Sequence, residues 1–377
     1  MVNARYRLVW PESLFVWEAR RVADLHDDIL FSSVVHLLSE AFQDPAVVEA
    51  FTAETGAHRG SFASASDYDS ARAWLRGLSG DTARLIPYSP PQYYAERKGL
   101  VSTSERPFEV LGEQFGILLR DMQDNGYFPI ALPRECEDDW VEWDQVSQRV
   151  SRAIHMPFTW AGNPTEVGSW GQALLLSVVE FFHDQAQRPR RPAYFHEHND
   201  CGWHYTEHSA EAGAAVYRWR VNQLLDRHGT GLNLGRSGDE RGRLVQRFGS
   251  PLDNEADARA AEGAEDAQDE VAHAIRTFRE RGASSTQKRT ALALLAGALE
   301  PRRPRLRELL GKDEADLFNI ANNFGIRHRN DRQRMGYGDE FLDYLFGVFL
   351  SSVRLMESVE KRPKSQEPSV EAKPAGK

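Results

Sequence analysis

Helical periodicity is the feature that most restricts the fold of this chain. In the clearest stretch, residues 313–356, apolar positions three and four apart occur on both sides of a polar loop. The first apolar set lies within residues 317–324 and the second within residues 342–356. Such stripes are typical of amphipathic helices that pack on a core. We therefore expect a helix, a polar loop and a second helix here.

The same spacing predicts the fold class of the whole chain. Helical stripes dominate from residue 107 onward, and the sequence shows neither an internal repeat nor the strand–helix alternation of a parallel sheet. One exception is Leu232–Val245, where two short apolar runs flank GRSGDERG, the pattern of a β-hairpin. We expect a mostly α, multi-helix bundle with one small hairpin. Strands should hold less than about a tenth of the residues, most of them in that hairpin.

Changes in composition divide the chain into four parts. Residues 1–105 read as an N-terminal, mainly helical region that ends after a proline-rich connector. Residues 106–250 form a central helical region with a His-rich turn and the hairpin, and residues 251–361 form a C-terminal helical domain. The tail, 362–377, is rich in Pro and Lys without aromatic residues, so we expect it to be disordered.

The composition is that of a globular cytoplasmic protein. The 377 residues are 41% hydrophobic and hold only two cysteines, which excludes a disulfide framework. No window approaches the roughly 18 uncharged apolar residues of a membrane helix, and charges interrupt the N-terminus too often for a secretory signal. We expect a cytoplasmic location without membrane contact.

The net charge of −10 is unevenly distributed along the chain. Residues 276–334 carry fourteen Lys and Arg against seven Asp and Glu. A basic block in an acidic chain can form a focused anion site. The alternative is that these charges are the solvated faces of packed helices. Both interpretations remain open from the sequence.

Three stretches in residues 222–356 resemble a known family. They are NQLLDRHGTGLNLGRSGDERGRLV, VAHAIRTFRERGASSTQKRTALALLAGALE and LFNIANNFGIRHRNDRQ. Their order is similar to the C-terminal half of bacterial abortive-infection-like proteins, which are grouped with HEPN domains. The resemblance implies a helical, often dimeric domain with an antiviral-defence role, and in active members metal-independent RNA cleavage.

The sequence departs from the active HEPN pattern at one position. That pattern has Arg, a polar residue, three to five further positions and then His. Arg329-Asn330 opens the pattern, but the places for His are taken by residues 334–336. The available His328 instead follows Arg327 directly. On a helix, adjacent side chains point about 100° apart, so these two can converge on one phosphate only in a loop.

The resemblance places the expected site in the polar loop. His can move a proton near neutral pH and Arg can stabilise charge on phosphate, so we expect catalytic roles for Arg327, His328 and Asn330. RNA-binding roles fall to Asn323, Arg329, Arg332 and Arg334. No metal or cofactor is expected. RNA, a second copy of the chain and a defence-system protein are the expected partners. The alternative is a non-enzymatic interaction or sensor protein in which the loop is structural.

A second cluster of chemically versatile side chains lies within residues 194–208. It holds His196, His198, Asp200, Cys201, His204 and His208. His204 and His208 have the spacing of a helical zinc pair and Cys201 is a candidate third ligand, which would allow a metal-dependent hydrolase at the His198–His208 turn. We expect instead a structural turn whose imidazoles lie too far apart to share an ion.

Overall fold

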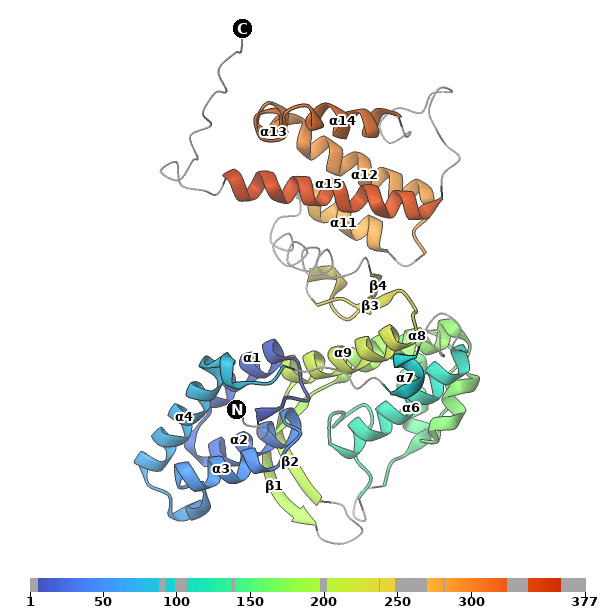
Figure 1. Cartoon of the computed structure of the whole chain (residues 1–377). Helices are drawn as coiled ribbons and strands as arrows, with labels where there is room; N and C mark the ends of the chain where they lie inside the picture. Colours follow the sequence, from blue (N-terminus) through green and yellow to red (C-terminus); the bar gives the residue numbers. More distant parts are fainter. Residues whose placement is uncertain are drawn as a thin grey trace. The chain divides into compact units, whose positions relative to one another are not determined.

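The computed structural model describes residues 6–87, 93–98, 107–136, 140–196, 202–236, 238–247, 270–280, 282–323 and 338–360 (Figure 1). The chain divides into two compact units, Met1–Thr230 (unit 1) and Gly231–Lys377 (unit 2). Helices hold most of the described residues in both units, so the expected mostly α fold is confirmed. Among the described residues, none of the helices combines the length and apolarity required to cross a bilayer.

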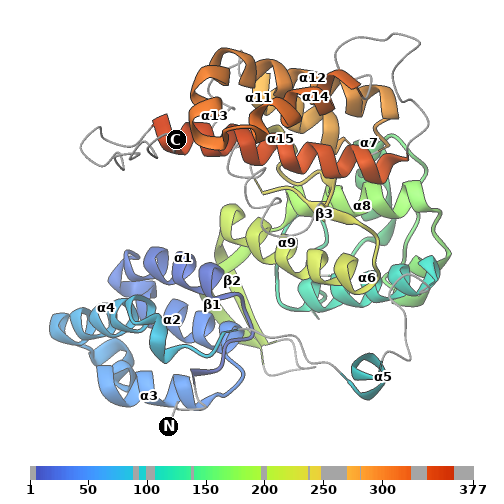
Figure 2. The same ribbon diagram turned by 45° about the horizontal axis from the view of Figure 1, so that its top comes forward.

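Unit 1 begins with a group of four helices. They are α1 (Glu12–Ala23), α2 (Asp27–Ala41), α3 (Ala46–Thr55) and α4 (Ala65–Gly80), with short 3-10 turns η2 (Ala57–Phe62) and η3 (Thr82–Arg84). α1 packs on α2 and α4, and α3 packs on α4 (Figure 2). A capping box at Ser64 and Asp67 begins α4.

The second helical group of unit 1 contains the longest helices of that unit. Its members are α5 (Tyr94–Arg97), α6 (Phe108–Asp124), α7 (Trp143–Ile154), η5 (Pro164–Ser169), α8 (Gln172–Gln185) and α9 (Ala210–Arg227). Two glycines of α6 allow η5 to lie directly against its backbone. A Cβ on Gly112 would come within 2.5 Å of the Val167 carbonyl oxygen, and one on Gly116 within 2.7 Å of the Pro164 carbonyl oxygen.

A hairpin that the sequence pattern misses connects the two helical groups. The expected irregular turn at residues 194–208 is wrong, because β1 (Arg188–His196) pairs antiparallel with β2 (Gly202–Ser209). Pro189 and Pro192 conceal β1 in the sequence, since proline cannot donate to a ladder and usually marks strand ends or edges. The register shifts around these prolines. β1 packs against α2 and α9, so it is a central element of unit 1.

Unit 2 is a helical bundle preceded by a short hairpin. The strands β3 (Leu232–Leu234) and β4 (Leu244–Gln246) confirm the expected hairpin, although β1 and β2 hold more residues. The helices are α11 (Glu270–Arg279), α12 (Ser285–Leu299), α13 (Arg303–Leu310), α14 (Asp313–Asn323) and α15 (Asp339–Glu360), with η8 (Glu300–Arg302) between α12 and α13.

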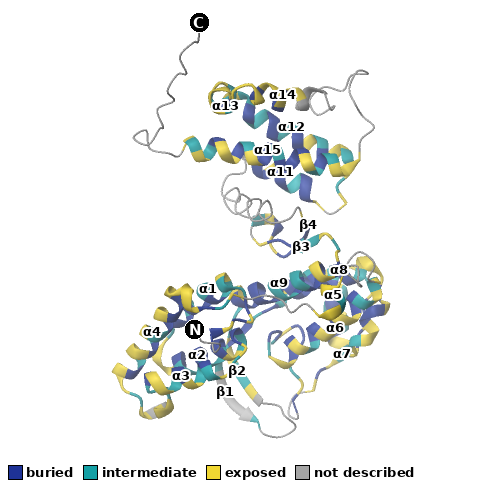
Figure 3. Ribbon diagram, in the orientation of Figure 1, coloured by how far each residue is buried: buried dark blue, intermediate teal, exposed yellow. Residues whose placement is uncertain are grey.

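The core of unit 2 lies where the buried faces of these helices meet (Figure 3). Phe278 of α11 stacks on Phe346 of α15 with a centroid distance of 4.1 Å. Leu295 of α12 and Leu317 and Phe318 of α14 are buried in the same cluster. The apolar stripes expected at residues 317–324 and 342–356 therefore lie in the core, as far as the described residues extend.

The two units differ from the four parts expected from composition. Residue 106 falls inside unit 1, so the N-terminal and central regions form one unit. The β3–β4 hairpin belongs to unit 2 rather than to the central region. The tail at 362–377 lies outside the described residues.

Candidate functional site

The polar loop predicted as an RNA site lies outside the described residues. This applies to Arg327, His328, Arg329, Asn330, Arg332 and Arg334, while Asn323 is the last residue of α14. The proposed catalytic and RNA-binding roles therefore stay predictions. Both flanking helices are anchored, because Phe318 of α14 is buried and Asp339 of α15 accepts a hydrogen bond from Ser285 at 2.8 Å.

Much of the basic block around this loop is paired with carboxylates. Arg279 is buried against Glu240 at 3.0 Å, and Lys288 contacts Asp343 at 3.0 Å. Further pairs are Arg276–Asp239, Arg302–Glu360, Arg303–Glu314, Arg305–Glu308 and Arg307–Glu314. These described cations fit the interpretation of packed, solvated helix faces better than that of an open anion site.

The His-rich segment does not form the zinc site considered from its sequence. His204 and His208 lie on strand β2 rather than on a helix. Four residues along a strand span about 13 Å, so these two imidazoles cannot share an ion. Cys201 lies outside the described residues. The expectation that all the imidazoles are far apart is nevertheless wrong, because ligand atoms of His196, His204 and Cys136 lie within 4.8 Å of one another.

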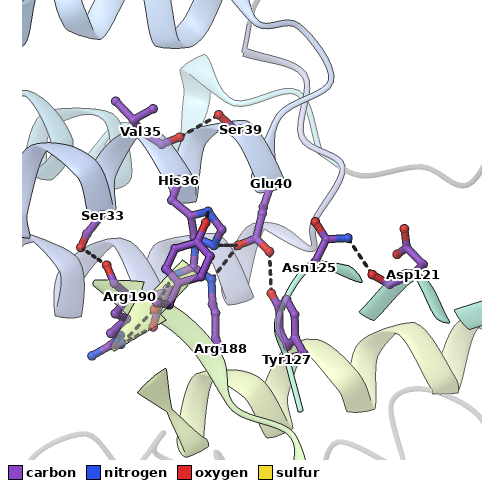
Figure 4. Close-up of polar contacts among 12 residues, drawn as sticks. Ser33, Val35, His36, Ser39, Glu40, Asp121, Asn125, Tyr127, Arg188 and Arg190 are labelled. Atoms are coloured by element: carbon purple, nitrogen blue, oxygen red, sulfur yellow. Dashed lines mark hydrogen bonds and ion pairs between the residues drawn. The ribbon is translucent and has the colours of Figure 1, made fainter. Parts of the chain in front are cut away.

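A charge network in unit 1 consists of Glu18, Glu40, Arg188 and Arg190, of which Glu18 and Arg188 are fully buried. Arg188 donates to Glu40 of α2 from Nε at 2.7 Å and contacts Glu18 of α1 at 3.2 Å. Arg190 donates to both carboxylate oxygens of Glu18, at 2.9 and 3.1 Å. The Tyr127 hydroxyl donates to Glu40 at 2.6 Å (Figure 4). Two cations thus balance two anions.

Strand β1 positions both arginines of this network. Arg188 and Arg190 both contact Glu18 of α1, so the two side chains lie on one side of β1 although the register shifts at Arg190. Ser33 of α2 donates to the Arg190 carbonyl at 2.9 Å, and the Gln187 amide donates to the Tyr127 carbonyl at 2.8 Å. These bonds fix β1 between the two helical groups.

Burial makes the charge states of the network interdependent. The side chains of Glu18 and Arg188 are only 1% and 0% exposed. Burial acts to raise the pKa of Glu40, but the Arg188 guanidinium, His36 and the Tyr127 hydrogen bond together outweigh that effect and hold the pKa below its ordinary value. Burial, reinforced by the Glu40 carboxylate, raises the pKa of Tyr127. Glu40 is therefore ionised and Tyr127 neutral near neutral pH.

His36 completes the network as a neutral member. Its Nε2 lies 3.4 Å from Glu40, and the Tyr205 hydroxyl lies 3.4 Å from its Nδ1. Burial lowers the pKa of His36 from 6.5 to about 4, although the Glu40 carboxylate acts in the opposite direction. The imidazole is therefore uncharged at neutral pH and does not disturb the balance of charges.

A pocket of about 700 Å³ opens directly beside this network. Glu40 and Tyr127 belong to both. Its walls come from the residues before α1, from α2, from α6 and the segment after it, and from α9. The polar and aromatic side chains that line it include Trp10, Glu40, Tyr127, Trp219, Arg220, Gln223 and Arg227. Ligand pockets in proteins have volumes of about 300–1,000 Å³, so this one is of ordinary size.

One face of α9 supplies the most varied chemistry in the pocket. Trp219, Gln223 and Arg227 follow one another at four-residue spacing, so they share a face of the helix. The Trp219 ring lies 6.5 Å from that of Trp10, centroid to centroid. Arg220 pairs with Asp121 of α6 at the same pocket. Aromatic faces, amides and guanidiniums are therefore brought together.

Sequence reasoning misses this site because its parts lie far apart in the chain. Glu18 and Arg188 are 170 residues apart, and no local motif links them. The one available signal was the spacing of Arg188 and Arg190 within RPRRP, since residues two apart share a face of a strand. The prolines in that segment obscured the strand.

No family model, curated protein or solved structure matches this chain. The resemblance of residues 222–356 to abortive-infection-like proteins therefore stays a prediction.

Proposed function

We propose that unit 1 is a ligand-binding module whose pocket takes a nucleotide-sized molecule with a flat ring and an anionic group. The observation that carries this proposal is the α9 face on which Trp219, Gln223 and Arg227 line one pocket. Bases stack on aromatic side chains, amides hydrogen-bond with base edges, and arginines bind phosphate. This corresponds to the sensor function considered as an alternative from the sequence.

The charge network supports a binding role for the pocket rather than catalysis by Glu40. Arg188 and Tyr127 both donate hydrogen bonds to the Glu40 carboxylate, and the pKa of Glu40 is lowered. A general base must be free to take a proton near the working pH, whereas this carboxylate is held ionised by its partners. The network thus lines the pocket through Glu40 and Tyr127, and its two cations neutralise its two anions.

Intrinsic fluorescence provides a direct binding test. All nine tryptophans precede residue 231, so the signal reports on unit 1. We expect adenosine or guanosine monophosphate to change it with saturation, whereas ribose 5-phosphate binds more weakly because it lacks the base. Trp219→Leu should weaken nucleotide binding by about 5- to 150-fold, the value of one base–aromatic stack. Arg227→Gln should weaken binding of the monophosphate more than that of the nucleoside.

Two exposed residues of unit 1 supply matched controls. Trp140 is 81% exposed and Arg152 lies on the exposed face of α7, and neither lines the pocket. Trp140→Leu and Arg152→Gln should leave the affinity unchanged. The proposal fails if no nucleotide at millimolar concentration alters either the fluorescence or the melting temperature of the wild type.

A second candidate function is defence-related RNA cleavage by unit 2 at the loop Arg327–Asn330. The observation that favours it is the anchoring of both flanking helices, because Phe318 is buried and Asp339 is bonded to Ser285. The resemblance assigns His328 and Arg327, between these two helices in the sequence, to one phosphate. Homodimerisation would place a second copy of the loop beside it.

One variant tests this second function. If the loop is catalytic, His328→Ala abolishes RNA cleavage while the melting temperature stays nearly unchanged, since surface substitutions usually cost less than about 0.5 kcal/mol. Folded His328→Ala protein with full wild-type activity would remove the ribonuclease hypothesis. If the loop is structural, the same substitution should destabilise by about 1–3 kcal/mol through unpaired buried groups.

A further inference from the structure

Three side chains of metal-ligand type meet at one end of the β1–β2 hairpin. They are Cys136 from the segment after α6, His196 at the end of β1, and His204 of β2. One ligand atom of each lies within 4.8 Å of the others. Cys136 is buried and the two histidines are half-buried, so the cluster sits just beneath the surface.

The strand register explains how the two histidines come together. His196 pairs with Gly202, and His204 pairs with Tyr194. In the register of the ladder the two histidines are therefore diagonal neighbours, two positions apart. Their ring centroids are 4.8 Å apart. No register shift interrupts this part of the ladder.

Contacts on both sides hold Cys136 against this face. Arg134 donates to the Trp203 carbonyl of β2 at 3.1 Å, and Gln123 of α6 donates to the Pro133 carbonyl at 2.7 Å. The Cys136 Sγ then lies 3.3 Å from Nδ1 of His196. The segment 133–136 therefore bridges α6 and the hairpin, with the thiol directed at the histidines.

We propose that Cys136, His196 and His204 bind a Zn²⁺-type divalent ion that ties the hairpin to the segment after α6. In tetrahedral zinc sites with Zn–S of about 2.3 Å and Zn–N of about 2.0–2.1 Å, sulfur and nitrogen ligands lie about 3.5 Å apart. The separation of 3.3 Å between Sγ and Nδ1 is close to this value. A simple thiol–imidazole hydrogen bond also has this length, and the two arrangements differ in whether the protein binds a stoichiometric metal ion.

The ion would act as a clamp on the strand that carries the charge network. β1 holds Arg188 near one end and His196 at the other. Fixing His196 and His204 to Cys136 joins the hairpin to a segment 60 residues before His196, so binding should stabilise unit 1 increasingly as the free metal concentration rises. The site needs a thiolate and neutral imidazoles, so binding releases protons and weakens at low pH.

Cobalt(II) is a suitable probe because its thiolate complexes absorb in the near ultraviolet. Purified full-length chain would be stripped with a chelator and titrated with Co²⁺, and then with Zn²⁺ as competitor. We expect one equivalent of Co²⁺ to produce a sulfur-to-metal charge-transfer band and the visible bands of tetrahedral cobalt. Zn²⁺ should abolish both sets of bands and raise the melting temperature of unit 1.

Variants of the described ligands identify the site. Cys136→Ser should lose the charge-transfer band, and His204→Ala should weaken Co²⁺ binding by more than about tenfold, since even outer-shell substitutions can cost 10–100-fold. His208→Ala is the matched control, because it removes an imidazole from the same strand and should change nothing. Circular dichroism of the metal-free variants checks that each one folds.

Two results would overturn the proposal. One is the absence of a stoichiometric cobalt complex in the folded wild type, which would leave only the thiol–imidazole hydrogen bond. The other is an unchanged charge-transfer band in Cys136→Ser, which would assign the thiolate to Cys201, the second of the two cysteines. His204→Ala binding Co²⁺ as tightly as the wild type would equally remove His204 from the site.

Discussion

In unit 1, four charged side chains pair between α1, α2 and β1, two of them fully buried, whereas the core cluster of unit 2 consists of aliphatic and aromatic side chains. Arg188 and Glu18 are as buried as Phe278 and Leu295. A buried charge is tolerated only with its partner in place, whereas an apolar side chain needs only a filled volume around it. Unit 2 also buries an ion pair, Arg279 with Glu240, but its core cluster depends on packing, whereas the contact of α1, α2 and β1 in unit 1 depends on particular pairings.

The largest expected effect comes from removing the central cation of unit 1. Arg188→Met leaves Glu40, whose side chain is only 18% exposed, without its cation, while Glu18 keeps Arg190, and we expect a loss of up to about 3–5 kcal/mol. The double variant Arg188→Met/Glu40→Gln should recover part of this loss because it also removes the unpaired charge. Urea unfolding followed by tryptophan fluorescence measures this for unit 1.

A neighbouring arginine on β1 gives the control for that experiment. Arg191 pairs with Asp28 and Glu207, but its side chain is 42% exposed. Exposed ion pairs contribute about 0–1 kcal/mol, so Arg191→Met should have a small effect. A double variant no more stable than Arg188→Met would show that unpaired charge is not the cause.

In unit 2, truncation of a core side chain should have an effect that is independent of charge. Leu295→Ala removes a fully buried side chain of α12 and should cost about 2–5 kcal/mol. Hydrogen exchange of α12 and α15 amides should accelerate while that of α2 and α9 stays unchanged. Leu309→Ala, at a position that is 41% exposed, serves as the control. Equal acceleration in both units would show that the units unfold together.

The stability of unit 1 should decrease in mild acid. Burial lowers the pKa of His36 to about 4, so between pH 6.5 and pH 4 His36 is protonated in the unfolded chain but neutral in the folded chain. Stability of unit 1 therefore falls as the pH drops through this window, by about 1–3 kcal/mol. Glu40, with its lowered pKa, adds a further loss below 4.5.

Substitution of His36 isolates its contribution to this pH dependence. His36→Gln should flatten the change in urea midpoint between pH 6.5 and pH 4.5. Part of the slope should remain, because burial also lowers the pKa of His208. A variant whose midpoint depends on pH as steeply as that of the wild type would contradict the assignment to His36.

The smallest expected effects concern a feature that both units share. Capping boxes begin α4 at Ser64 with Asp67 and α12 at Ser284 with Gln287. Replacing either serine with alanine should cost about 0.5–2 kcal/mol. The loss at Ser64 should be the greater, since Asp67 also pairs with Arg59 and Ser64 helps to orient that carboxylate. Exchange rates of first-turn amides in α4 and α12 measure both, and a greater loss at Ser284 would reverse this ranking.

The helices of this chain were predictable because their signals are local. The apolar stripe from Leu342 to Met356 predicts α15, and the capping residue Ser284 predicts the start of α12. Each signal involves residues within a few positions of one another, so neighbours in the sequence are neighbours in the structure. The β3–β4 hairpin was found for the same reason.

The candidate sites required the tertiary structure. The sequence by itself determined the mostly α class and the approximate positions of most helices, through local periodicity. Only the tertiary structure decided that Arg188 meets Glu18 and Glu40, and that Cys136 meets His196 and His204. The physical reason is that contacts between distant residues depend on how whole elements pack, and a short segment carries no information about its partner. Strand β1 lies between these two outcomes, since its alternating arginines were visible but its prolines concealed the strand that gives the alternation meaning.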